Sequence, residues 1–200
     1  MTDASSSTIH LLLVVASTRT GRFADLPLAW LQERLGARNE FDVEVLDVRD
    51  HPLPYYDLPR PPALAHREYS TDAERAVGVR LDAADALLVL TNEFNHGYSA
   101  ALKNLLDHFF AELRHKPMAF VGYGNVGGAR AIEQLRQVAA ELDMVSVRET
   151  VNILGQQMAA TRQTGAMPEE VTVLLDPRLG VMVDNLAWWS RALTVARRSG

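Results

Sequence analysis

The stretch that decides the fold is Ala86-Leu87-Leu88-Val89-Leu90, followed by the polar turn Thr91-Asn92-Glu93-Phe94-Asn95-His96-Gly97 and by a helical pattern that opens near Ser99. A short apolar run that stops at a cluster of Asn and Gly and then becomes helical predicts a strand, a loop and a helix. The loop therefore lies at the carboxyl end of the strand. In open α/β sheets, ligands bind at these strand ends.

Four other segments have the composition of strands. Residues 9–16 form an almost unbroken apolar run rich in branched side chains, typical of a strand buried on both faces of a parallel sheet. The other three are 41–48, 117–123 and 145–154, and helical spacing occurs over 26–36, 72–83, 99–113, 129–142 and 179–198. This alternation predicts an α/β fold, a doubly wound five-stranded parallel sheet with helices on both faces. Two strand orders of this class stay open at this point.

Two segments are expected to be irregular. The prolines of residues 50–62 forbid regular structure, and loops of this length are often functional. Residues 155–168, with their Gln, Thr and Gly, predict a mobile loop or lid. No linker or repeat divides the chain, so we expect a single domain over residues 9–200 after a disordered, Ser-rich tail over residues 1–8.

The composition excludes several classes of function. Because the chain has no cysteine, it has no disulfide or redox-active dithiol, and redox chemistry would need a cofactor. Its 6 histidines lack the spacing of metal ligands, so no metal site is predicted. A net charge of −5 without a basic run argues against a nucleic-acid partner. With neither a membrane-length apolar run nor a signal peptide, we expect a cytoplasmic protein without membrane contact.

The segment Ser17-Thr18-Arg19-Thr20-Gly21-Arg22 follows the first predicted strand. Its hydroxyls, its two guanidinium groups, the backbone amides of a tight glycine turn and a helix N-terminus together suit a phosphate. An N-capped turn with surface arginines is the alternative. The segment does not match G-x-x-x-x-G-K-[ST], which argues against ATP or GTP hydrolysis.

A literal G-x-G-x-x-G occurs as Gly122-Tyr123-Gly124-Asn125-Val126-Gly127, between a predicted strand and a helix. A Rossmann dinucleotide site needs this motif in the first unit of its fold, whereas here three strand-helix units precede it. We favour instead a loop whose glycines let the backbone approach a ligand closely. A turn that only allows close packing of helix and sheet is the alternative.

The turn at residues 91–95, together with Leu102-Lys103-Asn104 and Asp107, resembles the T-P-E-Y-N…L-K-N…D signature of the NADPH-dependent FMN reductase family, which is flavodoxin-like. The likeness extends from Leu11 to about Ile153. It implies the strand order 2-1-3-4-5, with FMN at the switch point between the first and third strands. This chain departs from the signature at Asn92, where the family has proline, and at Phe94, where it has tyrosine.

The resemblance also implies roles for individual residues. Ser17, Arg19 and Arg22 would hold the FMN phosphate. In the second loop, backbone groups and the Asn95 amide would hydrogen-bond the polar edge of the flavin, and Phe94 would pack beside the ring. The residues concerned are Asn92, Glu93, Phe94 and Asn95. The glycine-rich loop would face the flavin through Gly122, Tyr123, Gly124 and Gly127. For the 92–95 turn, asparagines that only cap backbone amides are the alternative.

The function that follows is that of an FMN-dependent NAD(P)H oxidoreductase. Hydride would pass from NADPH or NADH to FMN and on to a small acceptor, such as a flavin, quinone or azo compound, by a ping-pong mechanism. No catalytic side chain is assigned. The family implies a homodimer, or a dimer of dimers, which agrees with the excess apolar surface of the helix 99–113 and with Trp188 and Trp189. That these side chains only fill the core is the alternative. The alternatives are a flavodoxin-type electron carrier and a flavin-free interaction module that retains the fold.

Overall fold

The computed structural model describes residues 8–199, so the predicted tail over residues 1–8 lies, apart from Thr8, outside the described residues. Its core is a parallel five-stranded sheet in the order β2-β1-β3-β4-β5. The strands are β1 (Ile9–Val15), β2 (Phe41–Asp47), β3 (Ala86–Asn92), β4 (Pro117–Tyr123) and β5 (Val145–Ile153). This arrangement confirms the predicted fold class and strand order.

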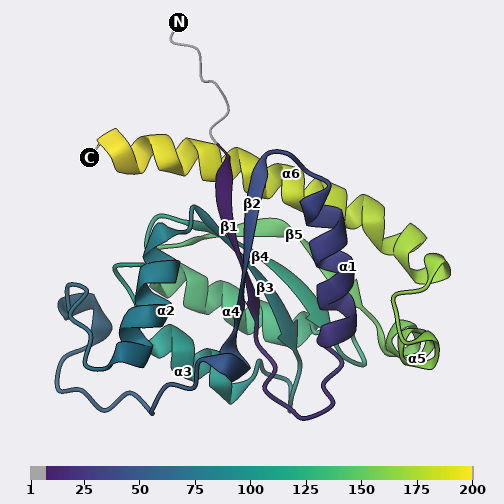
Figure 1. The fold of residues 1–200 in the computed structure, drawn as a ribbon, viewed down its shortest axis with the longest axis horizontal. Coiled ribbons are helices and arrows are strands. Elements are labelled where there is room, and N and C mark those ends of the chain that lie inside the picture. Colours follow the sequence, from purple (N-terminus) through teal and green to yellow (C-terminus); the bar gives the residue numbers. More distant parts are fainter. Residues whose placement is uncertain (1–7, 200) are drawn as a thin grey trace, which may run out of the picture.

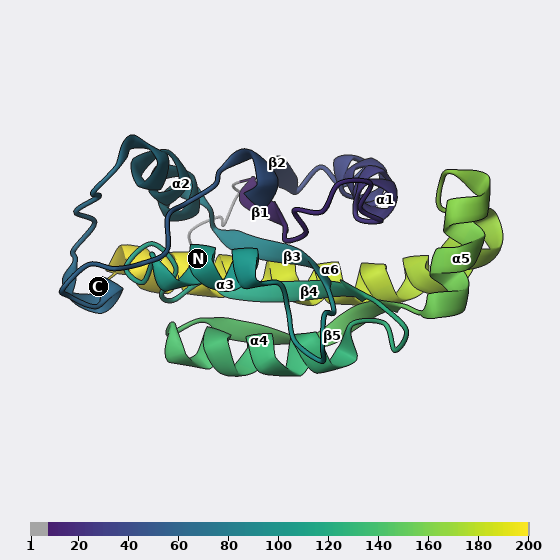
Figure 2. The same ribbon diagram turned by 90° about the horizontal axis from the view of Figure 1, so that it is seen from below.

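Helices cover both faces of the sheet (Figure 1). They are α1 (Asp25–Gly36), α2 (Asp72–Ala83), α3 (Ala100–Asp107), α4 (Ala129–Glu141), α5 (Gly155–Thr164) and α6 (Glu169–Ser199), with short 3-10 turns η1 (Val48–Asp50) and η2 (Pro62–Leu64). One apolar core lies under α1 and α6, and the other lies under α2, α3 and α4. Figure 2 shows α1 and α4 on opposite sides of the strands. The central strands β3 and β4 are buried along their whole length, as continuous apolar runs require.

Helix α3 is shorter than the predicted helix over residues 99–113. Ser99 caps it by accepting a hydrogen bond from the Leu102 amide, and the helix ends at Asp107. The apolar side chains expected to face another subunit are instead buried within the same chain, including Phe109 and Leu113 in the irregular segment after the helix. The interpretation of these apolar side chains as a surface available to another subunit was therefore wrong.

The prediction of a mobile loop or lid over residues 155–168 was also wrong, because residues Gly155–Thr164 form helix α5. The side chain of Gln157 accepts a hydrogen bond from the Leu154 amide at 2.8 Å and caps the first turn. Gly165 ends the helix in the left-handed conformation, at φ 76°. Gln, Met, Ala and Arg between these two ends are good helix formers.

The last helix begins earlier than predicted. Helix α6 starts at Glu169, not near Leu179, and it includes Pro177. A proline inside a helix is locally unfavourable. Pro177 lies on the exposed side of α6, and buried residues on both sides of it, Leu175 and Leu179, pack into the core. Tertiary packing therefore outweighs the local preference.

Lys116 is a charged side chain buried at the start of β4, only 4% exposed. Its Nζ donates to the carbonyl oxygens of Leu81 and Asp82 at the end of α2, at 2.6 and 2.7 Å. Burial, which disfavours the charged ammonium, lowers the pKa of Lys116 to about 8 from its ordinary 10.5. Between these two values the unfolded chain binds more protons than the folded chain, so this lysine makes stability increase with pH.

We therefore expect the free energy of unfolding, measured relative to that of Lys116→Met, to rise by up to about 3 kcal/mol as the pH increases through this window. Urea denaturation of both proteins between about pH 7 and about pH 10 measures this difference. A difference that stays flat with pH would show that the ammonium is not desolvated in the folded state.

Within residues 8–199, no helix has the length and apolar character needed to cross a bilayer.

Candidate functional site

The loop between β1 and α1 is organised around Arg22. Its guanidinium donates from Nε to Asp25 at 2.8 Å, and from Nη1 to the Ser17 carbonyl at 2.6 Å and to Asp47 at 2.8 Å. The Nη2 nitrogen contacts Asp47 and, at 2.7 Å, Asp25. An arginine has five N–H donors in a fixed fork, and four of them make hydrogen bonds within the chain. With a side chain 1% exposed, Arg22 ties the loop to the end of β2.

Arg22 and Asp47 stabilise each other's charged forms. The hydrogen bond that Arg22 donates to Asp47 raises the pKa of Arg22 further above its ordinary range. Burial would raise the pKa of Asp47, but the hydrogen bonds from Arg22 and from the Arg49 amide outweigh it, and that pKa lies below its usual range. Arg19 differs from Arg22, because it is exposed and lies over the ring of Phe94 at 5.9 Å.

The segment after β3 is a tight turn. Phe94 and Gly97 exchange two backbone hydrogen bonds of 2.8 Å, and Asn95 and His96 between them adopt left-handed conformations, at φ 48° and 69°. Two central residues with positive φ define a type I′ turn, which favours Asn at its first position. The turn leaves Asn95 exposed at its tip.

Glu93 fastens this turn to α4. Its carboxylate accepts hydrogen bonds from the Arg130 side chain at 2.7 Å and from the Arg130 backbone amide at 3.1 Å. Burial acts to raise the pKa of Glu93, but the hydrogen bonds from Arg130 prevail and the pKa is lowered. Glu93 is therefore ionised and neutralised within the chain at neutral pH.

A pocket of about 210 Å³ lies where the β1, β3 and β4 loops meet at the carboxyl edge of the sheet. It brings together eight of the residues predicted from sequence: Ser17, Arg19, Arg22, Asn92, Glu93, Phe94, Tyr123 and Gly124. Asn95, Gly122 and Gly127 do not line it. A Cβ on Gly122 would lie 2.6 Å from the Gly127 carbonyl oxygen, so at these two glycines the structure shows close packing.

Unpaired polar atoms concentrate in this pocket. Among residues 8–199, the buried side-chain polar atoms without a hydrogen-bond partner are the Asn92 amide nitrogen, the Asn92 amide oxygen and the Tyr123 hydroxyl. Both residues line the pocket, with exposures of 2% and 5%. Burial raises the pKa of Tyr123, so its hydroxyl keeps its proton. An unmet donor or acceptor of this kind costs about 1–3 kcal/mol and signals a missing partner.

Sequence reasoning missed four residues of the pocket: Phe23, Asn125, Met158 and Arg162. Phe23 directly follows the phosphate-loop segment, and Asn125 lies inside the glycine-rich motif, so their positions could have been inferred. Met158 and Arg162 come from α5, which lies beyond the carboxyl end of β5 (Figure 1). A helical interpretation of residues 155–164 would have been needed to find them.

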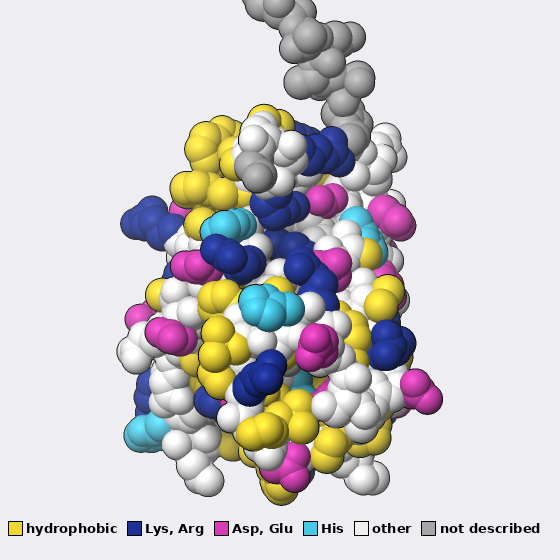
Figure 3. All heavy atoms as spheres, turned by 90° about the vertical axis from the view of Figure 1, so that its left-hand side faces the viewer, with side chains coloured by type: hydrophobic (Ala, Val, Ile, Leu, Met, Phe, Trp, Pro, Cys, Tyr) yellow, Lys and Arg dark blue, Asp and Glu magenta, His cyan; other side chains and the backbone are white. Residues whose placement is uncertain are grey.

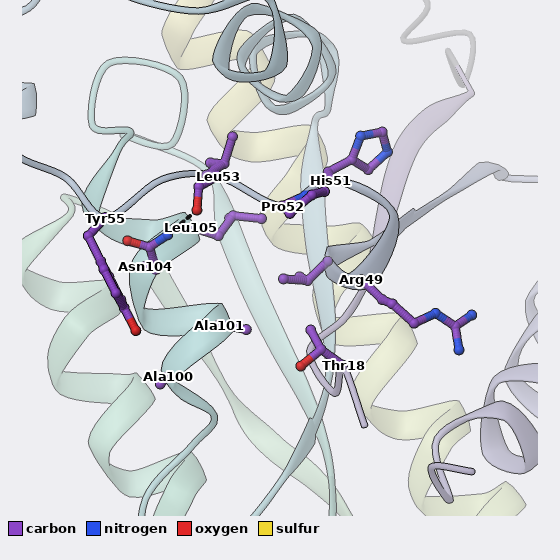
Figure 4. Close-up of a pocket in the computed structure, with 11 residues that line it drawn as sticks. Thr18, Arg49, His51, Pro52, Leu53, Tyr55, Ala100, Ala101, Asn104 and Leu105 are labelled. Atoms are coloured by element: carbon purple, nitrogen blue, oxygen red, sulfur yellow. Dashed lines mark hydrogen bonds between the residues drawn. The ribbon is translucent and has the colours of Figure 1, made fainter. Parts of the chain in front are cut away.

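A second cavity, of about 440 Å³, lies on the other side of the β1–α1 loop (Figure 4). Thr18, the start of α3 and the proline-rich segment line it, and its walls are mainly apolar. Asn104 pins this segment by donating to the carbonyl oxygens of Leu53 and Pro54, both at 3.0 Å. The predicted irregular loop is therefore ordered at this point by side chains of α3. Within the described range 8–199, no cluster of potential metal ligands occurs.

The sheet order, with a polar pocket at the switch point between β1 and β3, defines a flavodoxin-like α/β protein. The model of one family within this class, the NADPH-dependent FMN reductases, matches residues 9–158. This chain belongs to that family. It is therefore an oxidoreductase whose cofactors are FMN and a reduced nicotinamide nucleotide.

Individual relatives agree with this assignment. An NAD(P)H-dependent FMN reductase of Schizosaccharomyces pombe is 34% identical over 137 residues, 68% of each chain. One from Pseudomonas aeruginosa is 30% identical over 94% of this chain and 98% of its own. The solved structure of FerB, an NAD(P)H:(acceptor) oxidoreductase from Paracoccus denitrificans, has the same fold, with a TM-score of 0.68 at 21% identity over 92% of this chain and 98% of FerB.

Proposed function

We propose that the pocket at the ends of β1, β3 and β4 holds FMN, and that the protein passes reducing equivalents from NADPH or NADH through it to a small acceptor such as a flavin, quinone or azo compound. The observation that carries this proposal is the set of unpaired atoms on Asn92 and Tyr123. Their amide and hydroxyl offer donors and acceptors to the polar edge of a planar ring, while Phe94 offers an apolar face.

The residues fit the cofactor in two parts. Ser17 and Arg19 would hold the phosphate, because Arg19 makes no ion pair with any residue of the described chain. Arg22, whose guanidinium is bound to Ser17, Asp25 and Asp47, would position the loop instead of touching the phosphate. Asn92, Phe94, Tyr123 and Gly124 would border the ring. FMN, when bound, supplies a ring that accepts a hydride and returns two electrons.

The first experiment is the visible spectrum of the purified protein, recorded under argon before and after addition of FMN and then of NADPH. We expect a flavin band that sharpens on binding and bleaches with NADPH. Arg19→Gln should weaken FMN binding by about tenfold to a hundredfold, because a charge-assisted hydrogen bond to the phosphate is lost. Arg148→Gln is the matched control, since the Arg148 side chain is 94% exposed outside the pocket.

Two outcomes would point to the alternatives. A protein that binds FMN but does not bleach with NADPH would be a flavodoxin-type carrier. A colourless protein that ignores FMN would be an interaction module that retains the fold. Unchanged FMN affinity in Arg19→Gln would remove Arg19 from the phosphate site.

We infer a ping-pong mechanism, since a flavin at the edge of the sheet would offer the same open face of its ring to both substrates. The donor and the acceptor would then use the same place in turn. Double-reciprocal plots of initial rate at several fixed acceptor concentrations are expected to be parallel. Intersecting lines would indicate a ternary complex and contradict the shared position.

The homodimer is also a proposal. It is supported by exposed apolar residues at seven-residue spacing along α6, namely Leu174, Val181, Trp188 and Val195. Trp189, by contrast, packs against the core and is not part of this surface. Sedimentation at micromolar concentration tests the dimer. The cytoplasmic location expected from the sequence stays a prediction.

A further inference from the structure

Helix α5 places a guanidinium group against the pocket. Arg162 lies over the ring of Phe23, with its guanidinium carbon 5.3 Å from the ring centroid, and both residues line the pocket. The helix that carries Arg162 is capped at both ends and anchored by Thr161, which is fully buried. The aromatic ring and the rigid helix together hold the cation in place.

The charges around the pocket divide into two groups. Arg22 is neutralised by Asp25 and Asp47, and Glu93 is neutralised by Arg130. Arg19 and Arg162 also line the pocket, but neither makes an ion pair with a described residue, and each lies over an aromatic ring. The pocket therefore carries two positive charges that the folded chain leaves without a counterion.

This arrangement differs from that of the larger hollow at the amino end of the sheet, on the side where α6 ends. Figure 3 shows that side, with basic and acidic side chains interleaved. Each arginine of that hollow has a carboxylate partner: Arg67 pairs with Asp82, Arg114 with Asp143 and Arg197 with Asp85. Those cations connect parts of the fold to one another. Arg19 and Arg162 make no such connection.

We propose that Arg162 binds a phosphate group of the nicotinamide nucleotide, which makes α5 part of the electron-donor site. This inference rests on the proposed function, which requires two phosphate-bearing ligands at one pocket. The β1–α1 loop, with Ser17 and Arg19, provides the site for the phosphate of the resident FMN. Arg162 comes from a different element, and its side chain is exposed at the pocket's edge, where a ligand that must arrive and leave at every turnover can reach it.

The test compares FMN-loaded wild-type protein with Arg162→Gln, Arg162→Lys and the control Arg148→Gln. Calorimetric titration with NADP⁺ and with NAD⁺ measures nucleotide binding without turnover, and quenching of FMN fluorescence measures cofactor binding. For Arg162→Gln we expect nucleotide binding to weaken on the order of tenfold, FMN affinity to stay within about twofold, and KM for the reduced nucleotide to rise in parallel. Arg162→Lys, which keeps the charge, should recover part of the loss, and Arg148→Gln should match the wild type.

The pattern across nucleotides identifies the phosphate. Weaker binding of NADP⁺ alone assigns Arg162 to the 2′-phosphate, and weaker binding of both nucleotides assigns it to the diphosphate. The proposal is overturned if nucleotide binding is unchanged, or if FMN affinity falls while nucleotide binding does not. A wild-type protein that binds FMN but is not reduced by NADPH would defeat the proposed function itself, which is a separate result.

Discussion

Arg22→Gln is expected to lower the free energy of unfolding by about 3–5 kcal/mol, the cost of removing one partner from a buried ion pair. The Arg22 side chain is 1% exposed and that of Asp47 is 12% exposed, so the substitution leaves a largely buried carboxylate whose remaining cation is the half-exposed Arg49. The Ser17 carbonyl loses its donor as well. Urea denaturation of the FMN-free protein at neutral pH measures the change.

The matched control is Arg49→Gln. Arg49 also contacts Asp47, at 3.4 Å, but its side chain is 45% exposed, and such pairs contribute about 0–1 kcal/mol. The double variant Arg22→Gln with Asp47→Asn should regain part of the stability, because it removes the unpaired charge. A loss of less than about 1 kcal/mol in Arg22→Gln would show that the pair does not hold the loop.

The same variants separate two roles of Arg22 in cofactor binding. If Arg22 acts by positioning the loop, FMN affinity should recover in the double variant along with stability. If Arg22 contacts the phosphate directly, FMN affinity should stay low when stability returns. Titration of each folded variant with FMN distinguishes these results, and we expect recovery because the guanidinium is buried and makes four hydrogen bonds within the chain.

Asn92→Leu is expected to have opposite effects on stability and on binding. In the flavin-free protein the Asn92 amide is 2% exposed and both of its polar atoms lack partners. Replacing it with an apolar side chain of similar volume should raise the free energy of unfolding by about 1–3 kcal/mol, because the protein no longer buries an amide without hydrogen bonds. FMN binding should weaken by about tenfold or more, because the amide would otherwise pair with the ring.

Thermal unfolding of the apoprotein and FMN titration measure the two effects separately. Tyr123→Phe is the companion variant: it removes one unpaired hydroxyl, and we expect the same two signs with smaller magnitudes. If Asn92→Leu destabilises the apoprotein, the amide already has hydrogen-bond partners there and is not available to a ligand. A stabilised protein with unchanged FMN affinity would place the ring away from Asn92.

The local sequence pattern predicted the secondary structure correctly where core packing and intrinsic helix or strand propensity favour the same element. The helix predicted over residues 72–83 matches α2, whose Thr71 and Glu74 form a capping box, and the strand predicted over 117–123 matches β4. Continuous apolar runs identified the buried central strands, because a strand covered on both faces carries apolar side chains at nearly every position. The loops at the strand ends, and most of the pocket residues they carry, followed from these strands.

Helices α5 and α6 show where local pattern failed. A glycine at the start of α5 and a proline inside α6 are unfavourable locally, and neither α5 nor the first ten residues of α6 were predicted as helix. The structure accepts both, because capping at Leu154 and core packing on each side of Pro177 contribute more than the local cost. Met158 and Arg162 were missed for this reason.

The sequence by itself determined which segments are strands, which loops lie at their carboxyl ends and which residue types those loops carry, because hydrophobic periodicity and turn chemistry act over a few neighbouring residues. Only the tertiary structure decided how the charges are paired. Arg22 meets Asp47, and Arg130 meets Glu93, across 25 and 37 positions of chain. No local pattern encodes such distances, since an ion pair forms wherever the fold brings two side chains together. The fold therefore determines whether an arginine forms an ion pair within the chain or is available to bind a ligand.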